Sequence, residues 1–267
     1  MSYGFSEINN SQTSVVLQKQ AGLLTALVDR ENIKPFVALN LCSATNGIGS
    51  ELESVSGQAI ITYVISGEGQ YRDSTGKSGC LKKDDWAWII SGSGILHAIK
   101  PTTDDYLAIQ VSIALSPALE NSLPQSSYIE ASARNKNDPA QVLIGRNGIN
   151  RGTFAAPSLV NLLIVHLDVQ QQWTYELPLN HQFAWASVIS GSVKINGEKK
   201  SQNKIDTYHT PAEKIQCRAL SESILVIGSA HEFDYDLVAQ NTSVHTSIES
   251  LQQGLRGVAQ IKMLQHL

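Results

Sequence analysis

Histidines are the first residues to examine for chemistry, because imidazole serves both as a metal ligand and as an acid or base near neutral pH. The chain contains seven of them. His231-Glu232 begins like the HExxH motif of zinc proteases, but Tyr235 stands where the second histidine belongs. Five others show no ligand spacing with one another: His166, His181, His209, His245 and His266. Histidine spacing alone therefore predicts no metal site.

Serine, glycine and cysteine give no stronger motif. Gly92-Ser93-Gly94 is not a nucleophile elbow, since Ile95 occupies a place where GxSxG needs glycine. Gly47-Ile-Gly49 is too short for a phosphate-binding loop and lacks the GK[ST] that would follow. The cysteines are widely spaced, without a CxxC pair, and predict neither a disulfide framework nor a zinc site: Cys42, Cys80 and Cys217.

Composition excludes several classes of protein. Of the 267 residues, 42% are hydrophobic and 16% are charged, which is typical of a folded globular chain with one large core or two of ordinary size. The net charge of -4 argues against direct binding of nucleic acid. The start of the chain has no basic segment followed by an apolar run, and no apolar stretch is long enough to cross a bilayer. We expect a cytoplasmic protein without a membrane or nucleic-acid partner.

The elements that would position a site are strands, and they occur in two copies. YVISGEGQYR begins at Tyr63 and SVISGSVKIN begins at Ser187. Each copy of Val-Ile-Ser-Gly ends an apolar, β-branched run and is followed by hairpin signals, including Asn196-Gly197 in the second copy. A further alternating strand closes each unit: YLAIQVSI from Tyr106 and SILVIG from Ser223. The four shared letters indicate a duplication.

The spacing of these strands predicts an all-β chain of two tandem antiparallel barrels or jelly rolls with a short C-terminal helix. We expect the first domain over residues 1–120, a connecting segment over 121–140, the second domain over 141–232, and a C-terminal segment over 233–267. Thr246-Ser-Ile-Glu249 reads as a capping box that opens the helix, in which Gly254 and Gly257 are unfavourable.

The stretch TYVISGEGQYRDSTGKSGCLKKDDWAWIISGSGILH, from Thr62 to His97, resembles the first barrel of the pirin family, whose members are tandem cupins. Members read TYxxxGxxxHRDSxGxxGxxxxGDxxWMxAGxGIxHSE there, and this chain matches most of those letters at the same spacing. The resemblance implies two cupin domains, with iron or another divalent metal held in the first by three histidines and one glutamate. Two of these histidines come from HPHxGFE before TY, and the other two ligands come from HSE.

This chain departs from the family's ligand pattern. The two histidines of HPHxGFE become Glu53 and Val55, and HSE keeps its histidine as His97 but replaces its glutamate with Ile99. Aliphatic side chains have no lone pair to donate to a metal. The resemblance therefore predicts a degenerate site with Glu53 and His97 as remnants, no metal at full occupancy and no other cofactor. The alternative is a weakly bound divalent ion such as iron.

Five residues are the predicted lining of a pocket in the first barrel: Glu53, Val55, Tyr63, His97 and Ile99. Tyr63 is included because it shares strand parity with Glu53 and Val55 if no bulge intervenes. We expect a non-catalytic protein that binds a small apolar or aromatic molecule or a protein partner. The alternatives are an enzyme like the quercetin 2,3-dioxygenases of the family, or catalysis by Glu53 and His97 as an acid and base pair.

Overall fold

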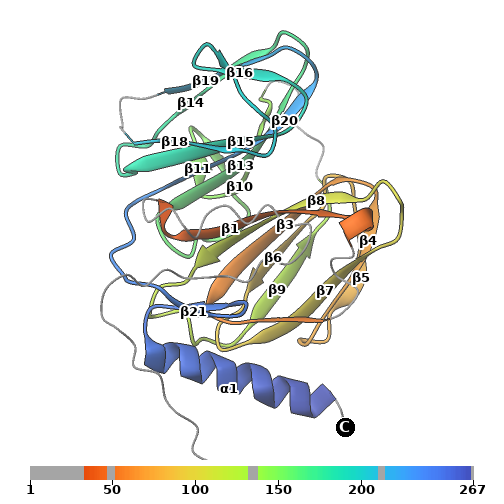
Figure 1. The fold of residues 1–267 in the computed structure, drawn as a ribbon, viewed down its shortest axis with the longest axis vertical. Helices are drawn as coiled ribbons and strands as arrows, with labels where there is room; N and C mark the ends of the chain where they lie inside the picture. Colours follow the sequence, from red (N-terminus) through yellow and green to blue (C-terminus); the bar gives the residue numbers. More distant parts are fainter. Residues whose placement is uncertain (1–32, 47–51, 132–137, 210–213, 266–267) are drawn as a thin grey trace, which may run out of the picture.

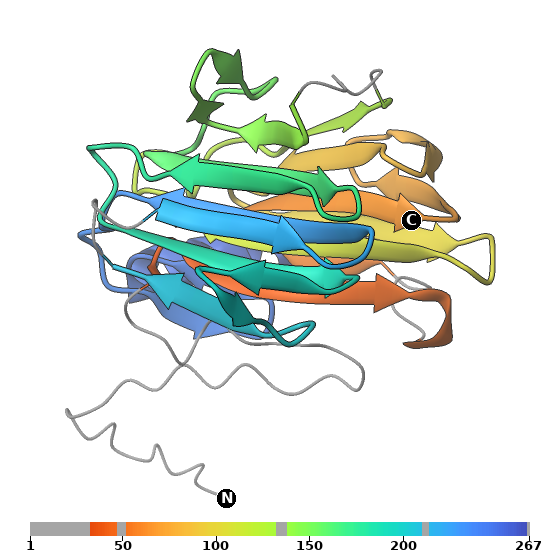
Figure 2. The ribbon, with the colours of Figure 1, turned by 90° about the horizontal axis from the view of Figure 1, so that it is seen from above.

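The structure is a computed structural model that describes residues 33–46, 52–131, 138–209 and 214–265. Two β-sandwiches lie against each other, and a single helix in the described residues crosses the far end of the first (Figure 1). Seen from above, the strands of both sandwiches run across the molecule in nearly the same direction (Figure 2).

The first sandwich consists of two facing antiparallel sheets. One sheet has the order β1 (Phe36–Ser43), β8 (Leu107–Ala114), β3 (Gln58–Ser66), β6 (Trp86–Ile90) and β9 (Gln125–Ile129). The other has the order β2 (Glu53–Val55), β7 (Ile95–Pro101), β4 (Glu68–Asp73) and β5 (Ser78–Lys82). A 3-10 turn, η2 (Ala44–Asn46), follows β1.

The second sandwich repeats this plan. Its larger sheet has the order β10 (Ala140–Ile144), β13 (Val160–Leu167), β20 (Ser223–Ala230), β15 (Phe183–Ser190) and β18 (Ile205–Tyr208). Its smaller sheet has the order β14 (Gln172–Glu176), β19 (Lys214–Ala219), β16 (Val193–Ile195) and β17 (Glu198–Lys199). A small hairpin, β11 (Arg146–Asn147) and β12 (Asn150–Arg151), stands apart. Strands β13 to β20 pair among themselves as β1 to β8 do, so each unit is an eight-stranded jelly roll and the predicted duplication is confirmed.

The repeated Val-Ile-Ser-Gly has the same geometric role in both units. Each copy ends a central strand, and a bulge precedes its serine, between Val64 and Ser66 and between Val188 and Ser190. The glycines that follow have positive φ, 70° at position 67 and 81° at position 191, and the nearest atoms leave no room for a Cβ. The motif therefore marks the turn out of the larger sheet.

The segment predicted to connect the two domains is partly a strand of the first one. Within 121–140, β9 pairs with β6 from Trp86 opposite Ile129 to Ile90 opposite Gln125. The polar composition that suggested a loop reflects an edge strand with one face partly exposed. Between the barrels the two larger sheets share one apolar core, which includes Phe36 and Trp185 with ring centroids 5.2 Å apart.

The C-terminal segment returns to the first barrel through the hairpin of β21 (Val238–Gln240) and β22 (Ser243–His245), and then forms α1 (Ile248–Gln265). The predicted helix is confirmed, but its cap is one residue later than expected. The Ser247 hydroxyl accepts a hydrogen bond from the Ser250 N–H at 3.1 Å, while Thr246 donates to Glu120 instead.

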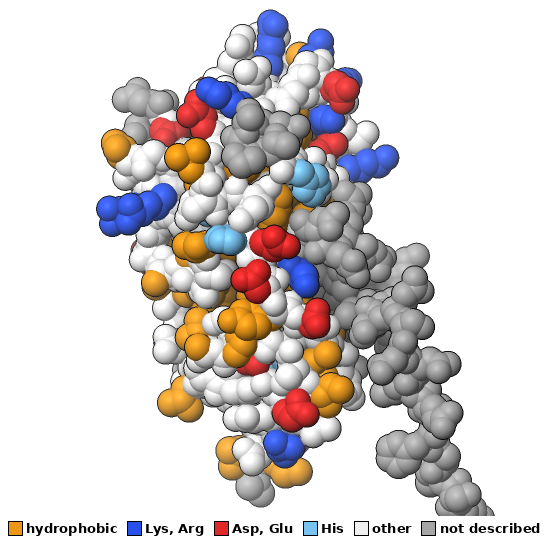
Figure 3. All heavy atoms as spheres, turned by 90° about the vertical axis from the view of Figure 1, so that its left-hand side faces the viewer, with side chains coloured by type: hydrophobic (Ala, Val, Ile, Leu, Met, Phe, Trp, Pro, Cys, Tyr) orange, Lys and Arg blue, Asp and Glu red, His pale blue; other side chains and the backbone are white. Residues whose placement is uncertain are grey.

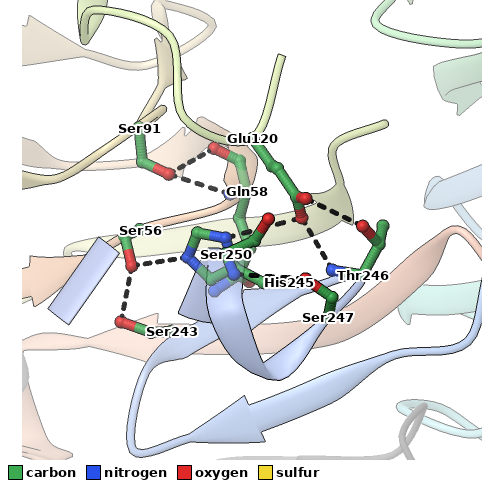
Figure 4. A network of polar contacts seen from close by, with 9 residues as sticks. All are labelled: Ser56, Gln58, Ser91, Glu120, Ser243, His245, Thr246, Ser247 and Ser250. Carbon is green, nitrogen blue, oxygen red and sulfur yellow. Dashed lines mark hydrogen bonds and ion pairs between the residues drawn. The ribbon is translucent and has the colours of Figure 1, made fainter. Parts of the chain in front are cut away.

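A buried polar cluster fastens this segment to the barrel (Figure 4). His245 and Glu120 are both almost completely buried, with His245 Nδ1 3.5 Å from a carboxylate oxygen. Because the Ser56 hydroxyl donates to Ser243, it accepts from His245 Nε2 at 2.9 Å. Burial lowers the pKa of His245, and the charge of Glu120 opposes that shift.

The described surface gives no sign of a large charged face on the side drawn in Figure 3, where acidic and basic side chains are interspersed. Within the described ranges, no helix has the length and hydrophobicity needed to cross a bilayer.

Candidate functional site

Glu53 and His97 are neighbours in the smaller sheet of the first barrel. They lie directly opposite each other on β2 and β7, and Asp73 of β4 lies on the other side of His97. Because directly opposed residues project from the same face, all three side chains lie on one side of the sheet. The two residues that the sequence identified as ligand remnants are thus brought together.

Val55 and Ile99 lie on the same strands, two residues from Glu53 and His97, and so share their face. Val55 packs with Ile60, Ile89 and Ile95 in one apolar cluster. Ile99 packs against a different cluster, formed mainly by Cys42, Val64, Leu81, Ala87, Tyr106 and Ala108. Glu53 and His97 therefore lie between two layers of hydrocarbon.

The facing sheet contributes three polar side chains at the same level. Asn40, Thr62 and Gln110 lie opposite one another on β1, β3 and β8. Asn40 Nδ2 donates to Gln110 Oε1 at 3.3 Å, and Gln110 Nε2 donates to Thr62 Oγ1 at 3.5 Å. We call Glu53, His97, Asn40, Thr62 and Gln110 the polar layer.

Sequence reasoning missed three of the five residues of the polar layer. The available signal was a single polar residue inside an otherwise apolar strand, such as Asn40 in FVALNLCS and Gln110 in LAIQVSIA. Such residues read equally well as solvent-facing positions of an alternating strand. Only the pairing of β1, β8 and β3 shows that they face inward.

Burial sets the protonation of the layer. His97 is almost fully buried, and desolvation lowers its pKa to about 4, against the opposing charge of Asp73. Desolvation raises the pKa of Glu53. Burial and the nearby Glu53 charge raise the pKa of the Cys42 thiol to about 12. The site therefore favours uncharged groups.

Two buried atoms of the layer have no hydrogen-bond partner in the described residues: His97 Nε2 and Asn40 Oδ1. Leaving a buried polar atom unpaired costs about 1–3 kcal/mol, so such atoms in a native structure call for an explanation.

Tyr63 does not belong to this pocket, and the prediction that it lines the pocket is wrong. It packs in the core between the barrels, where its hydroxyl donates to Asp84 at 2.7 Å and lies 3.2 Å from His166 Nε2. The parity argument fails because Gly57, with a φ of 74°, separates β2 from β3 and the two strands belong to different sheets.

A hollow of about 490 Å³ opens between the edge strands β5 and β9, and its lining contains no residue of the polar layer. Its lining includes the stacked rings of Tyr71 and Tyr128, whose centroids are 3.5 Å apart. The Tyr128 hydroxyl donates to Asp73 at 2.8 Å, and Asp73 in turn lies opposite His97.

The donor set does not fit the metal that the family resemblance implies. Val55 and Ile99 present only hydrocarbon at two of the four ligand positions. Across the described parts of the chain, no group of three or more histidine, cysteine or acidic side chains could hold an ion. Glu53 and His97 would leave most of a coordination shell to water.

Two jelly rolls in tandem, with inward-facing side chains at the centre of the first, define the bicupin class. The sequence places the chain within that class: residues 20–112 match the family model described as Pirin. This match, over the N-terminal part of the chain, confirms the resemblance to the pirin family that the sequence predicts.

Individual relatives agree with this assignment. A pirin-like protein of Caulobacter vibrioides is 25% identical over 186 residues, which cover 64% of this chain and 62% of that protein. The match therefore spans less than two thirds of the relative's length. A quercetin 2,3-dioxygenase of Acinetobacter baumannii superposes with a TM-score of 0.77 at 15% identity, covering 87% of this chain and 80% of the other. The pirin YhhW of Escherichia coli, solved with nickel(II), gives a TM-score of 0.61 at 17% identity, covering 77% and 86%.

Proposed function

We propose that this pirin-like bicupin works without a resident metal at full occupancy, as a non-catalytic protein that binds a small molecule in its first barrel. The observation that carries the proposal is the pair Val55 and Ile99. Both lie on the face of the sheet where the family resemblance puts ligands, and both are packed into apolar clusters.

Loss of two donors changes what the barrel can do. A divalent ion held by Glu53 and His97 alone would exchange readily and leave under mild chelation. What remains between the apolar clusters is a set of hydrogen-bonding groups, two of which have an unpaired atom in the described structure. Small barrels enclose either side chains or one modest ligand, and unpaired inward groups favour the second. The proposed metal-free function also allows a protein partner to bind the outer surface.

The second candidate function is an enzyme related to the quercetin 2,3-dioxygenases. It is favoured by the adjacency of Glu53 and His97 across β2 and β7. Such an enzyme would need a bound metal to activate its substrate and dioxygen, and the two aliphatic positions argue against one. Metal-free acid and base catalysis by the same pair is the remaining variant of this alternative.

We place the protein in the cytoplasm as part of this proposal. All three cysteines are free, and Cys42 and Cys217 are buried. Unpaired cysteines suit a reducing compartment.

Elemental analysis tests the proposal. Protein purified without chelator should contain well below one equivalent of iron, nickel, copper, manganese or zinc. Incubation with quercetin and added iron(II) should consume no dioxygen above the rate of iron and quercetin alone. A near-stoichiometric metal that is lost in His97→Ala, or quercetin-dependent oxygen uptake, would refute it.

A further inference from the structure

The second barrel is an internal comparison for the first, because the two share strand order and register. The bulge after Val64 and the bulge after Val188 align β3 and β8 with β15 and β20, and the neighbouring β1 aligns with β13. Three polar positions of the first barrel thereby have equivalents in the second: Asn40 corresponds to Leu163, Thr62 to Ala186 and Gln110 to Ile227.

The smaller sheets align in the same way. Counting from the glycines that end the two repeats, β4 matches β16, and their partners β7 and β19 follow. The residue equivalent to His97 is then Ile215. Tyr175 lies opposite Ile215 as Glu53 lies opposite His97, so Tyr175 is the equivalent of Glu53.

All five equivalent residues belong to the apolar core of the second barrel, and each is at most 1% exposed. Four of them are aliphatic, and the fifth, Tyr175, has a hydroxyl that is already paired with Asn161 and Ser229. The jelly roll therefore does not need unpaired polar atoms at this level. Burying polar groups is unfavourable unless each finds a partner. Because the fold does not require this cost in the first barrel, the polar layer is a candidate ligand site.

The donor-to-acceptor order of the hydrogen bonds in the polar layer indicates which hydrogen-bonding groups a ligand must have. The Asn40 amide donates to Gln110, and the Gln110 amide donates to Thr62, so the chain of donors begins at Asn40. In the described residues, the Asn40 carbonyl oxygen accepts no hydrogen bond, and His97 Nε2 has no hydrogen-bond partner. Both side chains are more than nine-tenths buried, whereas Gln110 and Glu53 are only partly buried.

We propose that the polar layer binds an uncharged carboxamide, whose N–H donates to Asn40 Oδ1 and whose amide group also pairs with His97 Nε2. This inference rests on the proposed metal-free function. A primary amide extends the chain of carboxamides by one link, and its C=O and N–H together can satisfy either tautomer of the imidazole. The layer is bounded by apolar clusters on both sides, which suits a flat group. Asn40, Thr62 and Gln110 offer no charge to compensate an ion.

Three small molecules of the same shape test the ligand class: acetamide, acetone and acetate. Acetamide has a donor and an acceptor, acetone has only an acceptor, and acetate carries a charge. We expect acetamide to shift the NMR signals of the His97 ring and the Thr62 methyl group in a saturable way, with a Kd on the order of millimolar for so small a ligand. Acetone and acetate should produce no saturable shift.

Variants locate the binding. Asn40→Leu, which installs the residue of the second barrel, should abolish the acetamide response, and Asn40→Ala provides a second test if the larger side chain prevents folding. Ser112→Ala is the matched control, because Ser112 is also buried inside the barrel on β8 but lies outside the polar layer. Its acetamide response should equal that of the unmodified protein.

The inference is overturned if acetamide gives no saturable shift, if acetone or acetate binds equally well, or if both Asn40 variants keep the response. Metal analysis of the same sample separates this failure from failure of the proposed function. If the protein is free of metal and acetamide causes no saturable shift, only the proposal of a carboxamide ligand is contradicted. If the protein contains a full equivalent of metal, the proposed metal-free function is contradicted.

Discussion

Gly254 of helix α1 lies directly against His245 of the preceding strand. A Cβ at position 254 would be 2.4 Å from His245 Nε2 and 2.4 Å from the Ser56 hydroxyl. A glycine that weakens an isolated helix thus allows the helix to approach the buried polar cluster (Figure 4).

Gly254→Ala should therefore destabilise the protein, although alanine is the better helix former by about 1 kcal/mol. The methyl group must displace a fully buried imidazole, and overpacking of this kind costs about 1–3 kcal/mol. Urea unfolding followed by circular dichroism measures the change. Gln253→Ala, on the exposed face of the same turn, is the control and should be neutral or slightly stabilising. A Gly254→Ala variant as stable as this control would show that the helix does not press on the cluster.

The polar layer makes a prediction about stability that is independent of any ligand. Asn40→Leu combined with Thr62→Ala and Gln110→Ile introduces the residues of the second barrel without leaving the Asn40 amide unpaired, and should raise the free energy of unfolding or leave it unchanged. The hydrogen bonds removed are long, at 3.3 and 3.5 Å, and apolar replacements of buried polar groups are often neutral or stabilising. The reciprocal change Ala186→Thr should be destabilising by about 1–3 kcal/mol, because its hydroxyl enters an apolar core. Equal losses from both changes would mean that the layer contributes to folding rather than to binding.

The sequence predicted the architecture because the evidence for it is local. Strand runs, turn glycines and the repeated Val-Ile-Ser-Gly all lie within short windows, and their register is the same in both units. The pair Glu53 and His97 came from the spacing of the pirin-like motif, and β2 and β7 do place the two opposite each other.

The rest depends on which strands pair, and no short window contains that information. Asn40 and Gln110 are 70 residues apart and become neighbours only through the pairing of β1 with β8. Tyr63 was misplaced because one glycine at position 57 changes the sheet to which the strand belongs. The edge strand β9 was missed because half-exposed strands and loops have similar composition.

Tyr63 joins the two barrels, so its hydroxyl should contribute to stability and not to ligand binding. Tyr63→Phe removes the hydrogen bond to Asp84 and the contact with His166, which should lower the free energy of unfolding by about 1–2 kcal/mol. The acetamide response should be unchanged in this variant. A Tyr63→Phe protein of normal stability that no longer responds would restore Tyr63 to the first-barrel pocket.

His181 should make stability depend on pH. Burial, with a smaller contribution from the charge of His231, lowers its pKa to about 4, and its Nδ1 lies 2.8 Å from the Ser229 hydroxyl. In the unfolded chain a histidine has a pKa of about 6.5, so between about pH 6.5 and 4 the unfolded state binds a proton that the folded state does not. Stability from this residue is therefore complete above pH 6.5 and is lost as the pH falls, by at most about 1.4 kcal/mol per unit. Unfolding at pH 7 and pH 5 should show a smaller difference in His181→Gln than in the unmodified protein, and no such reduction in His209→Gln, at an exposed histidine.

Restoring the family's donors should create the metal site that the native residues do not form. In the triple variant Glu53→His, Val55→His and Ile99→Glu, His97 would complete a set of three histidines and one glutamate on adjacent strands. Four converging donors should bind nickel(II) or iron(II) near one equivalent after gel filtration, where the unmodified protein retains far less. The same variant with Ile99→Ala in place of Ile99→Glu controls for the added histidines and should bind more weakly. Folding is checked by circular dichroism, since both replaced side chains pack in apolar clusters. If the folded triple variant retains no more metal than the native chain, the absence of donors is not what distinguishes this barrel, and the argument from Val55 and Ile99 fails.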